Sequence, residues 1–334
     1  MKHSLRNSII IFILTVLIIV YLLKDNFFDV TGLLVEAKLG FILLAVLIYI
    51  FYFILDTIPF YNFTREYNKE IPFKYMLYLN LVTKFFNGIT PLSTGGQPFQ
   101  VLELRKKELS GPNATNVIVQ NYIIFQIALV IWGIAAIVLN KTLNLFEPDP
   151  ALKQLCIIGY VLNFLILFLL FLVSFSKKVN FIVIKKTIDL LYKLKIVKHK
   201  EKQYEKWDKI CDDFYNNSKL LFKKQKLFLS GILFQLLCLS LFYSIPYVLS
   251  YSIDCGGDFT LVTSLSAGAY IFLMGCYIPI PGATGGMEYA FLGFYGNYLL
   301  GYELNALLLL WRLLTYYLPT IIGGIVFNIG QRKR

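Results

Sequence analysis

Residues 91–99 read PLSTGGQPF, and residues 281–289 read PGATGGMEY. Both stretches fit the pattern Pro-x-[Ser/Ala]-Thr-Gly-Gly-x-x-aromatic, with Pro91 aligned to Pro281. Proline and paired glycines break or end a helix, and each stretch follows an apolar run. Irregular backbone at membrane depth is tolerated only where protein or water covers it. The pair predicts an internal repeat of two interrupted hairpins, although two ordinary tight turns between helices would leave the same signature.

The composition around these motifs is that of a membrane protein. Of the 334 residues, 57% are apolar and only 16% are charged, whereas soluble domains carry about 25% charged residues. We therefore expect an all-α polytopic membrane protein with six to eight transmembrane helices and two re-entrant or broken-helix hairpins, at 84–100 and 279–300, in an inverted-repeat arrangement. Apolar runs of membrane-spanning length cover approximately residues 8–23, 39–58, 114–139, 152–175, 227–251, 259–281, 284–300 and 304–329.

The distribution of basic residues predicts the orientation of the chain. If both termini are cytoplasmic, the cytoplasmic connections contain 27 of the 32 Lys and Arg residues, as the positive-inside rule requires. The two motifs then enter the membrane from opposite faces. The sequence divides into a first membrane half (1–176), a basic insert (177–226) and a second membrane half (227–334). The insert predicts two amphipathic helices on anionic headgroups, with RNA or a soluble partner as the alternative.

Metal and cofactor chemistry have no recognisable signature here. The five cysteines form no CxxC pair, the two histidines lie in basic stretches, and no Walker-type phosphate loop occurs. We expect no metal site, no cofactor and no catalytic residue of these kinds.

Charged residues near the motifs are candidate substrate ligands. Glu288 and Arg312 lie in apolar segments, where a lone ion costs roughly 2.5–3.5 kcal/mol, so each should face a cavity or pair with the other. A purely structural pair is the alternative. A guanidinium suits a phosphate, and the helix N-termini at both Gly-Gly pairs would add amide donors. The predicted substrate-binding or translocation set is Lys84, Asn87, Thr94, Gly95, Gly96, Gln97, Pro281, Thr284, Gly285, Gly286, Glu288 and Arg312.

Other polar and small residues have simpler expected roles. Lys84 and Asn87 should line a cytoplasmic vestibule, and Asp56 should snorkel from the end of its span. The pair Gly323-Gly324 predicts a close-packing surface. A polar patch within 114–139 should hold helices together through hydrogen bonds; its members are Gln120, Asn121 and Gln126.

The motifs GITPLSTGGQPFQVLELRKK (88–107) and PIPGATGGMEYAF (279–291), with the late span WRLLTYYLP (311–319), resemble the flippase-like transmembrane domain of lysylphosphatidylglycerol synthases, the multiple peptide resistance factor family. The resemblance implies a bacterial inner-membrane protein that moves an aminoacylated or anionic phospholipid to the outer leaflet. Such movement lowers the negative surface charge and contributes to resistance against cationic antimicrobial peptides. By motif position, the resemblance implies functional roles for Thr94–Gln97, Pro281–Glu288 and Arg312.

The resemblance also sets the alternatives. Full-length relatives carry a soluble domain that takes lysine from lysyl-tRNA, whereas the longest non-membrane piece here is 177–226. We expect no lysyl transfer by this chain itself, so phosphatidylglycerol lysyltransferase is the alternative function, and tRNA is a partner only in that case. A membrane scaffold for a separate lipid-modifying enzyme is a further alternative. The expected partners are the membrane, anionic phospholipids, such an enzyme and a second copy of the chain.

Overall fold

The computed structural model describes residues 27–147, 150–193, 200–275 and 277–332. Within these ranges the regular structure is helical, which confirms the all-α polytopic prediction, and five segments are long and apolar enough to cross a membrane. The first predicted span, 8–23, lies outside the described residues. The five segments are α3 (Leu39–Arg65), α6 (Gly111–Leu143), α7 (Pro150–Phe175), α10 (Gln225–Ser250), and α13 (Gly301–Arg312) joined to α14 (Leu318–Arg332) by a π-helical turn, η4 (Leu313–Tyr317).

Two pairs of shorter helices form hairpins around the two motifs. The first hairpin is α4 (Phe73–Gly88) and α5 (Gly96–Arg105), and the second is α11 (Leu261–Gly275) and α12 (Gly286–Tyr295). The longest of these helices has 16 residues and measures about 24 Å, less than the roughly 30 Å of a hydrocarbon core. Neither hairpin is therefore a pair of complete spans.

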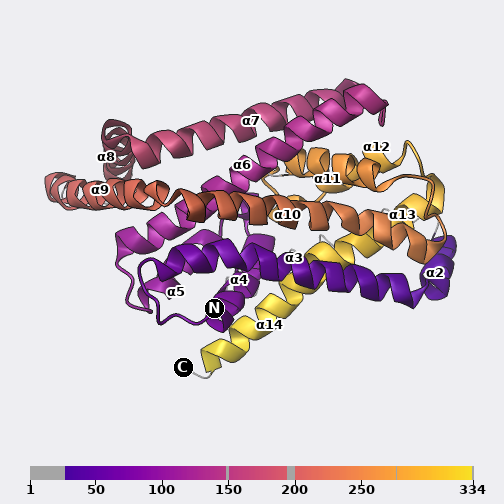
Figure 1. Cartoon of the computed structure of the whole chain (residues 1–334), viewed down its shortest axis with the longest axis horizontal. Helices are drawn as coiled ribbons and strands as arrows, with labels where there is room; N and C mark the ends of the chain where they lie inside the picture. Colours follow the sequence, from indigo (N-terminus) through magenta and orange to yellow (C-terminus); the bar gives the residue numbers. More distant parts are fainter. Residues whose placement is uncertain (1–26, 148–149, 194–199, 276, 333–334) are drawn as a thin grey trace.

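The hairpins approach each other from opposite ends of the bundle. Figure 1 shows the first hairpin toward the end that carries α8 (Lys177–Lys193) and α9 (Lys200–Lys223), called here the basic end, and the second toward the end that carries α2 (Phe27–Glu36). Each tip is a short 3₁₀ turn, η1 (Pro91–Ser93) or η3 (Pro281–Ala283), and the two turns contact each other. The motifs thus meet inside the bundle.

The repeat extends well beyond the nine-residue motifs. In the register that aligns Pro91 with Pro281, called here the repeat register, the helix starts also coincide. The starts of α5 and α12 are Gly96 and Gly286, and those of α6 and α13 are Gly111 and Gly301.

The packing of the two repeats is crossed. The helices α3 and α10 are the corresponding first members, and they pack along each other. Each hairpin packs against the last span of the other repeat, because α4 contacts α14 and α11 contacts α6. The helices α7, α8 and α9 stand outside this correspondence.

Close helix packing at α14 depends on the predicted small-residue surface. A Cβ atom at Gly323 would lie 2.5 Å from the carbonyl oxygen of Leu81 in α4, and one at Gly324 would lie 3.0 Å from the ring of Phe85. Only glycine allows the two backbones to come this close. The close-packing prediction is confirmed.

The basic insert forms two helices, α8 and α9, that pack on each other. At their junction Lys200 and Tyr204 donate to Asp189, each at 2.5 Å, and these donors hold the pKa of the Asp189 carboxyl below its ordinary value. The far half of α9 packs against α6, where the buried Asn116 amide donates to Ser218 at 2.5 Å. This half is thus part of the helix bundle, which differs from the expectation that the whole insert lies on headgroups.

Candidate functional site

The two tips share the conformation of their three-residue turns, but they differ at the next two residues, where Thr94 and Gly95 are helical, Thr284 is extended and Gly285 has positive φ. The second and third turn residues have positive φ in both, at 55° and 52° for Leu92 and Ser93, and at 66° and 52° for Gly282 and Ala283. The motif threonine closes each turn, since Thr94 donates to the Pro91 carbonyl at 3.0 Å and Thr284 to the Pro281 carbonyl at 2.7 Å. The shared letters of the motif therefore specify a shared turn.

Tyr316, on the π-helical turn η4, links the two tips. Its hydroxyl donates to the carbonyl oxygen of Gly88 in the first hairpin at 3.0 Å. Its ring lies against Gly282 in the second, where a Cβ atom would come within 2.2 Å of Tyr316 Cζ. A π-helical turn inside a span is uncommon and frequently marks a functional position. Tyr316 was not identified from the sequence.

Arg312 and Glu288 form a buried ion pair beside this junction. Arg312 Nε lies 2.7 Å from Glu288 Oε1, and each residue is only 4% exposed. The other carboxylate oxygen accepts from the Gly285 amide at 2.6 Å, so Glu288 also caps α12. The predicted pairing is present, and it joins α13 to the second hairpin.

The described residues satisfy only part of the hydrogen-bonding capacity of the Arg312 guanidinium. Nη1 donates to the Gly282 carbonyl at 3.4 Å, and the rings of Trp311 and Tyr316 lie 5.2 and 5.4 Å from Cζ. Nη2 is buried and has no hydrogen-bond partner among the described residues. A buried donor without a partner costs about 1–3 kcal/mol, and more when it is charged. The buried guanidinium therefore keeps one donor that no described residue satisfies.

The amides of the Gly-Gly pairs are engaged within the protein. Gly95 N donates to Thr90 Oγ1 and Gly96 N donates to Asn87 Oδ1, both at 2.9 Å. With the Gly285 amide bound to Glu288, three of the four expected substrate donors are occupied. The Asn87 side chain thus caps the start of α5, and its place in a vestibule stays a prediction.

The remaining motif residues differ in accessibility. Thr94 and Gly285 are exposed, Gln97, Pro281 and Gly286 are half-buried, and Thr284 is buried.

Lys84 takes part in a second ion pair, with Asp56, and both residues are half-buried. Lys84 Nζ lies 2.9 Å from Asp56 Oδ2 and 3.0 Å from the Tyr52 hydroxyl. The carboxylate also accepts from Asn80 at 3.1 Å and from Gln235 at 3.2 Å. This cluster joins α3, α4 and α10, so Asp56 pairs within the bundle in place of snorkelling, and a vestibule role for the partly exposed Lys84 stays a prediction. Sequence reasoning missed the pair because its two members lie on different helices, far apart along the chain.

The polar patch on α6 is less well satisfied than predicted. Gln126 donates to the Tyr122 hydroxyl at 2.9 Å, but the buried Gln120 amide has no partner in the part of the chain that the structure describes. In the repeat register, Tyr122 and Gln126 correspond to Arg312 and Tyr316. The position of the buried guanidinium is thus neutral in the first repeat and charged in the second, a difference that aligning the repeats would have revealed.

A protein-family comparison covers the whole of this site. The family model described as lysylphosphatidylglycerol synthase TM region matches residues 8–323. The comparison with curated proteins gave no match. The matched residues include both hairpins, the π-helical turn and both ion pairs.

Proposed function

The chain belongs to the lysylphosphatidylglycerol synthase transmembrane-region family, and from this premise we propose that it moves an anionic or aminoacylated phospholipid, of the lysylphosphatidylglycerol type, across the membrane. The single observation that carries the proposal is the Arg312 guanidinium, buried beside two touching hairpin tips with one nitrogen unpartnered among the described residues. Phospholipids of this class share a phosphate, which is the group that a guanidinium binds best.

The phosphate binds Arg312 at the junction of the tips. Its oxygens accept from Nη2, and they compete with Glu288 for the rest of the guanidinium. The ammonium groups of an aminoacylated head would in turn be attracted to the Glu288 carboxylate. Hairpins that enter from opposite ends and meet near the middle are the arrangement in which transporters alternate access to a central site. The acyl chains remain in lipid beside the bundle.

The proposed setting is a bacterial plasma membrane with both termini in the cytoplasm. Delivery of an aminoacylated lipid to the outer leaflet places positive charge there. Cationic peptides are attracted to an anionic surface by about 1 kcal/mol per basic residue, so this delivery contributes to resistance against them.

The test is lipid movement in proteoliposomes that contain the purified protein. The lipids are headgroup-labelled phosphatidylglycerol and its lysyl form, and the variants are Arg312→Ala and Glu288→Gln. Tyr122→Phe is the matched control, because Tyr122 is the repeat counterpart of Arg312. We expect the wild type and Tyr122→Phe to accelerate movement, and both site variants to lose most of that acceleration.

The proposal fails if neither lipid moves faster than in empty vesicles. It also fails if Arg312→Ala moves lipid as fast as the wild type. In the first case, transfer of lysine from lysyl-tRNA to phosphatidylglycerol is assayed on the same preparation, because lysyl transfer is the alternative activity.

A further inference from the structure

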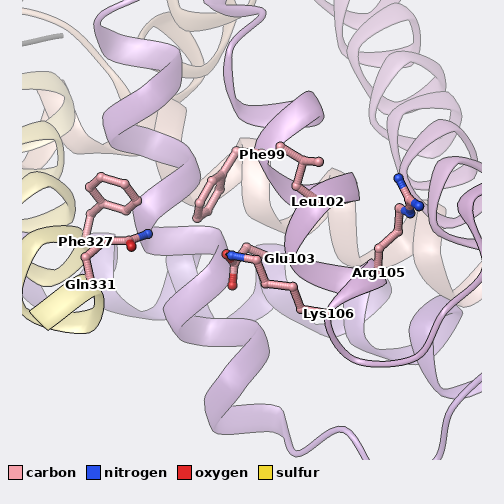
Figure 2. A pocket seen from close by; sticks show the side chains of 7 residues that line it. All are labelled: Phe99, Leu102, Glu103, Arg105, Lys106, Phe327 and Gln331. Atoms are coloured by element: carbon pink, nitrogen blue, oxygen red, sulfur yellow. The ribbon is translucent and has the colours of Figure 1, made fainter. Parts of the chain in front are cut away.

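A groove of about 460 Å³ opens on the side of the bundle between α5 and α14. It lies toward the basic end, where both helices end, and Figure 2 shows the side chains that line it. Sites for small molecules commonly have volumes of about 300–1,000 Å³. The lining residues are Phe99, Leu102, Glu103, Arg105, Lys106, Phe327 and Gln331.

One end of the groove is polar and built around a buried carboxylate. Glu103 is 1% exposed, and its oxygens lie 2.7 Å from Lys106 Nζ and 3.0 Å from the Tyr75 hydroxyl. The ion pair positions the Lys106 ammonium, whose side chain remains half-exposed at 55%. Arg105 also lines the groove, but in Figure 2 its guanidinium points away from Glu103 and Lys106. The excess charge of this polar end is therefore positive.

The other end is apolar and lies deeper along the helices. Phe99 precedes Arg105 on α5 and lies about 9 Å further along the helix axis. The Phe99 and Phe327 rings pack edge to face with centroids 5.8 Å apart, and both contact Phe86. Leu102 completes the wall and is 56% exposed. Basic side chains at one level and aromatic rings about one and a half turns deeper match a phospholipid, with its phosphate above its acyl chains.

The repeat shows that the fold does not require these charges. In the repeat register, Gly293 and Gly296 occupy the positions of Glu103 and Lys106. A Cβ atom at Gly293 would lie 2.6 Å from Leu152 of α7, so the corresponding face of α12 is closed by that helix. The equivalent face of α5 carries charged side chains and lines the groove.

We propose that this groove binds one anionic phospholipid from the leaflet at the basic end. Its phosphate lies against the Lys106 ammonium, and its acyl chain lies along Phe99 and Phe327. Phe99 packs on Phe86, whose carbonyl accepts from Thr90 beside the first tip, so packed side chains connect the groove wall to that tip. Its role as the lateral entrance for transported lipid rests on the proposed function, whereas the binding itself does not.

The test is photo-crosslinking of the full chain in bilayers that contain phosphatidylglycerol with a diazirine in its acyl chain. Crosslinked peptides are mapped by mass spectrometry, and phosphatidylcholine with the same diazirine chain is the lipid control. Lys106→Ala removes the positioned ammonium, and Leu102→Trp fills the groove. Lys107→Ala is the matched control, because Lys107 is exposed and adjacent but does not line the groove.

We expect phosphatidylglycerol to label the peptides that contain Phe99 and Phe327 more strongly than phosphatidylcholine does. Lys106→Ala should lower that labelling about fivefold, the effect of losing one well-placed basic contact, and Leu102→Trp should abolish it. Lys107→Ala should change it less than twofold. Equal labelling by both lipids, or labelling that survives Leu102→Trp, would overturn the proposal.

The same preparation separates this proposal from the proposed function. Groove labelling in a protein that moves no lipid keeps the binding site and removes its role as an entrance. Lipid movement without groove labelling keeps the function and removes the site.

Discussion

Arg312 has two roles that can be separated by experiment. It holds the second hairpin through Glu288 and the Gly282 carbonyl, and in the proposed function it also binds the lipid phosphate through Nη2. Removing one partner of a buried pair leaves the other charge uncompensated, whereas replacing both with apolar groups is often neutral. The structural and functional roles therefore respond differently to single and double substitutions.

Arg312→Met and Glu288→Gln should each destabilise the protein by about 3–5 kcal/mol. The double variant should recover most of that stability, because no unpaired charge remains. Lipid movement should stay absent in all three. Thermal unfolding in detergent and the proteoliposome assay measure the two effects. A double variant that regains both stability and lipid movement would show that the pair is only structural.

The corresponding turn positions Gly282 and Leu92 should respond in opposite ways to substitution. Gly282→Ala places a Cβ atom against Tyr316 at positive φ and should cost more than about 2 kcal/mol. Leu92→Gly relieves an unfavourable φ but adds unfolded-state freedom, so the net change should stay within about 1 kcal/mol. Unfolding temperatures of the two variants check this asymmetry. Equal destabilisation would contradict the assigned contact with Tyr316.

At the level of the helices, the sequence was most informative where a motif has a local physical meaning. Proline, threonine and paired glycines specified both tips, because proline fixes its own φ, threonine closes the turn by a hydrogen bond, and glycine allows conformations that other residues avoid. Hydropathy identified the long spans for the same local reason. The Asp56–Lys84 pair and the crossed packing of each hairpin on the other repeat depend on contacts between distant segments, and a single sequence does not carry that information.

The crossed packing of α4 on α14 predicts an unusually sensitive glycine. Gly323→Val should destabilise the protein by about 1–3 kcal/mol through overpacking, because its Cβ atom would meet the Leu81 carbonyl. Gly40→Ala is the control, since a Cβ atom at that helical position meets nothing within 4 Å, and it should be neutral or stabilising. Thermal unfolding of the two variants tests the contact, and similar unfolding temperatures would argue against it.

At the scale of the whole molecule, the opposed hairpins predict opposite accessibility of their outer ends. Glu108 lies just after α5 and Leu300 lies after α12, and both residues are exposed. The probes are the single variants Glu108→Cys and Leu300→Cys. In a background with the native cysteines replaced by serine, an impermeant maleimide should label position 300 in intact cells and position 108 only after permeabilisation. Labelling of both from the same side would contradict the inverted arrangement.

The proposed function also requires the junction of the tips to exclude small ions. A route for a charged lipid head is equally a route for protons and sodium ions, and a potential of roughly 100 mV acts on each charge with about 2.3 kcal/mol. The Tyr316 ring fills the space beside Gly282, and its hydroxyl binds Gly88 across the junction. We therefore expect the Tyr316 side chain to block the leakage of ions through the junction. A cell can then hold many copies of the protein without losing its membrane potential.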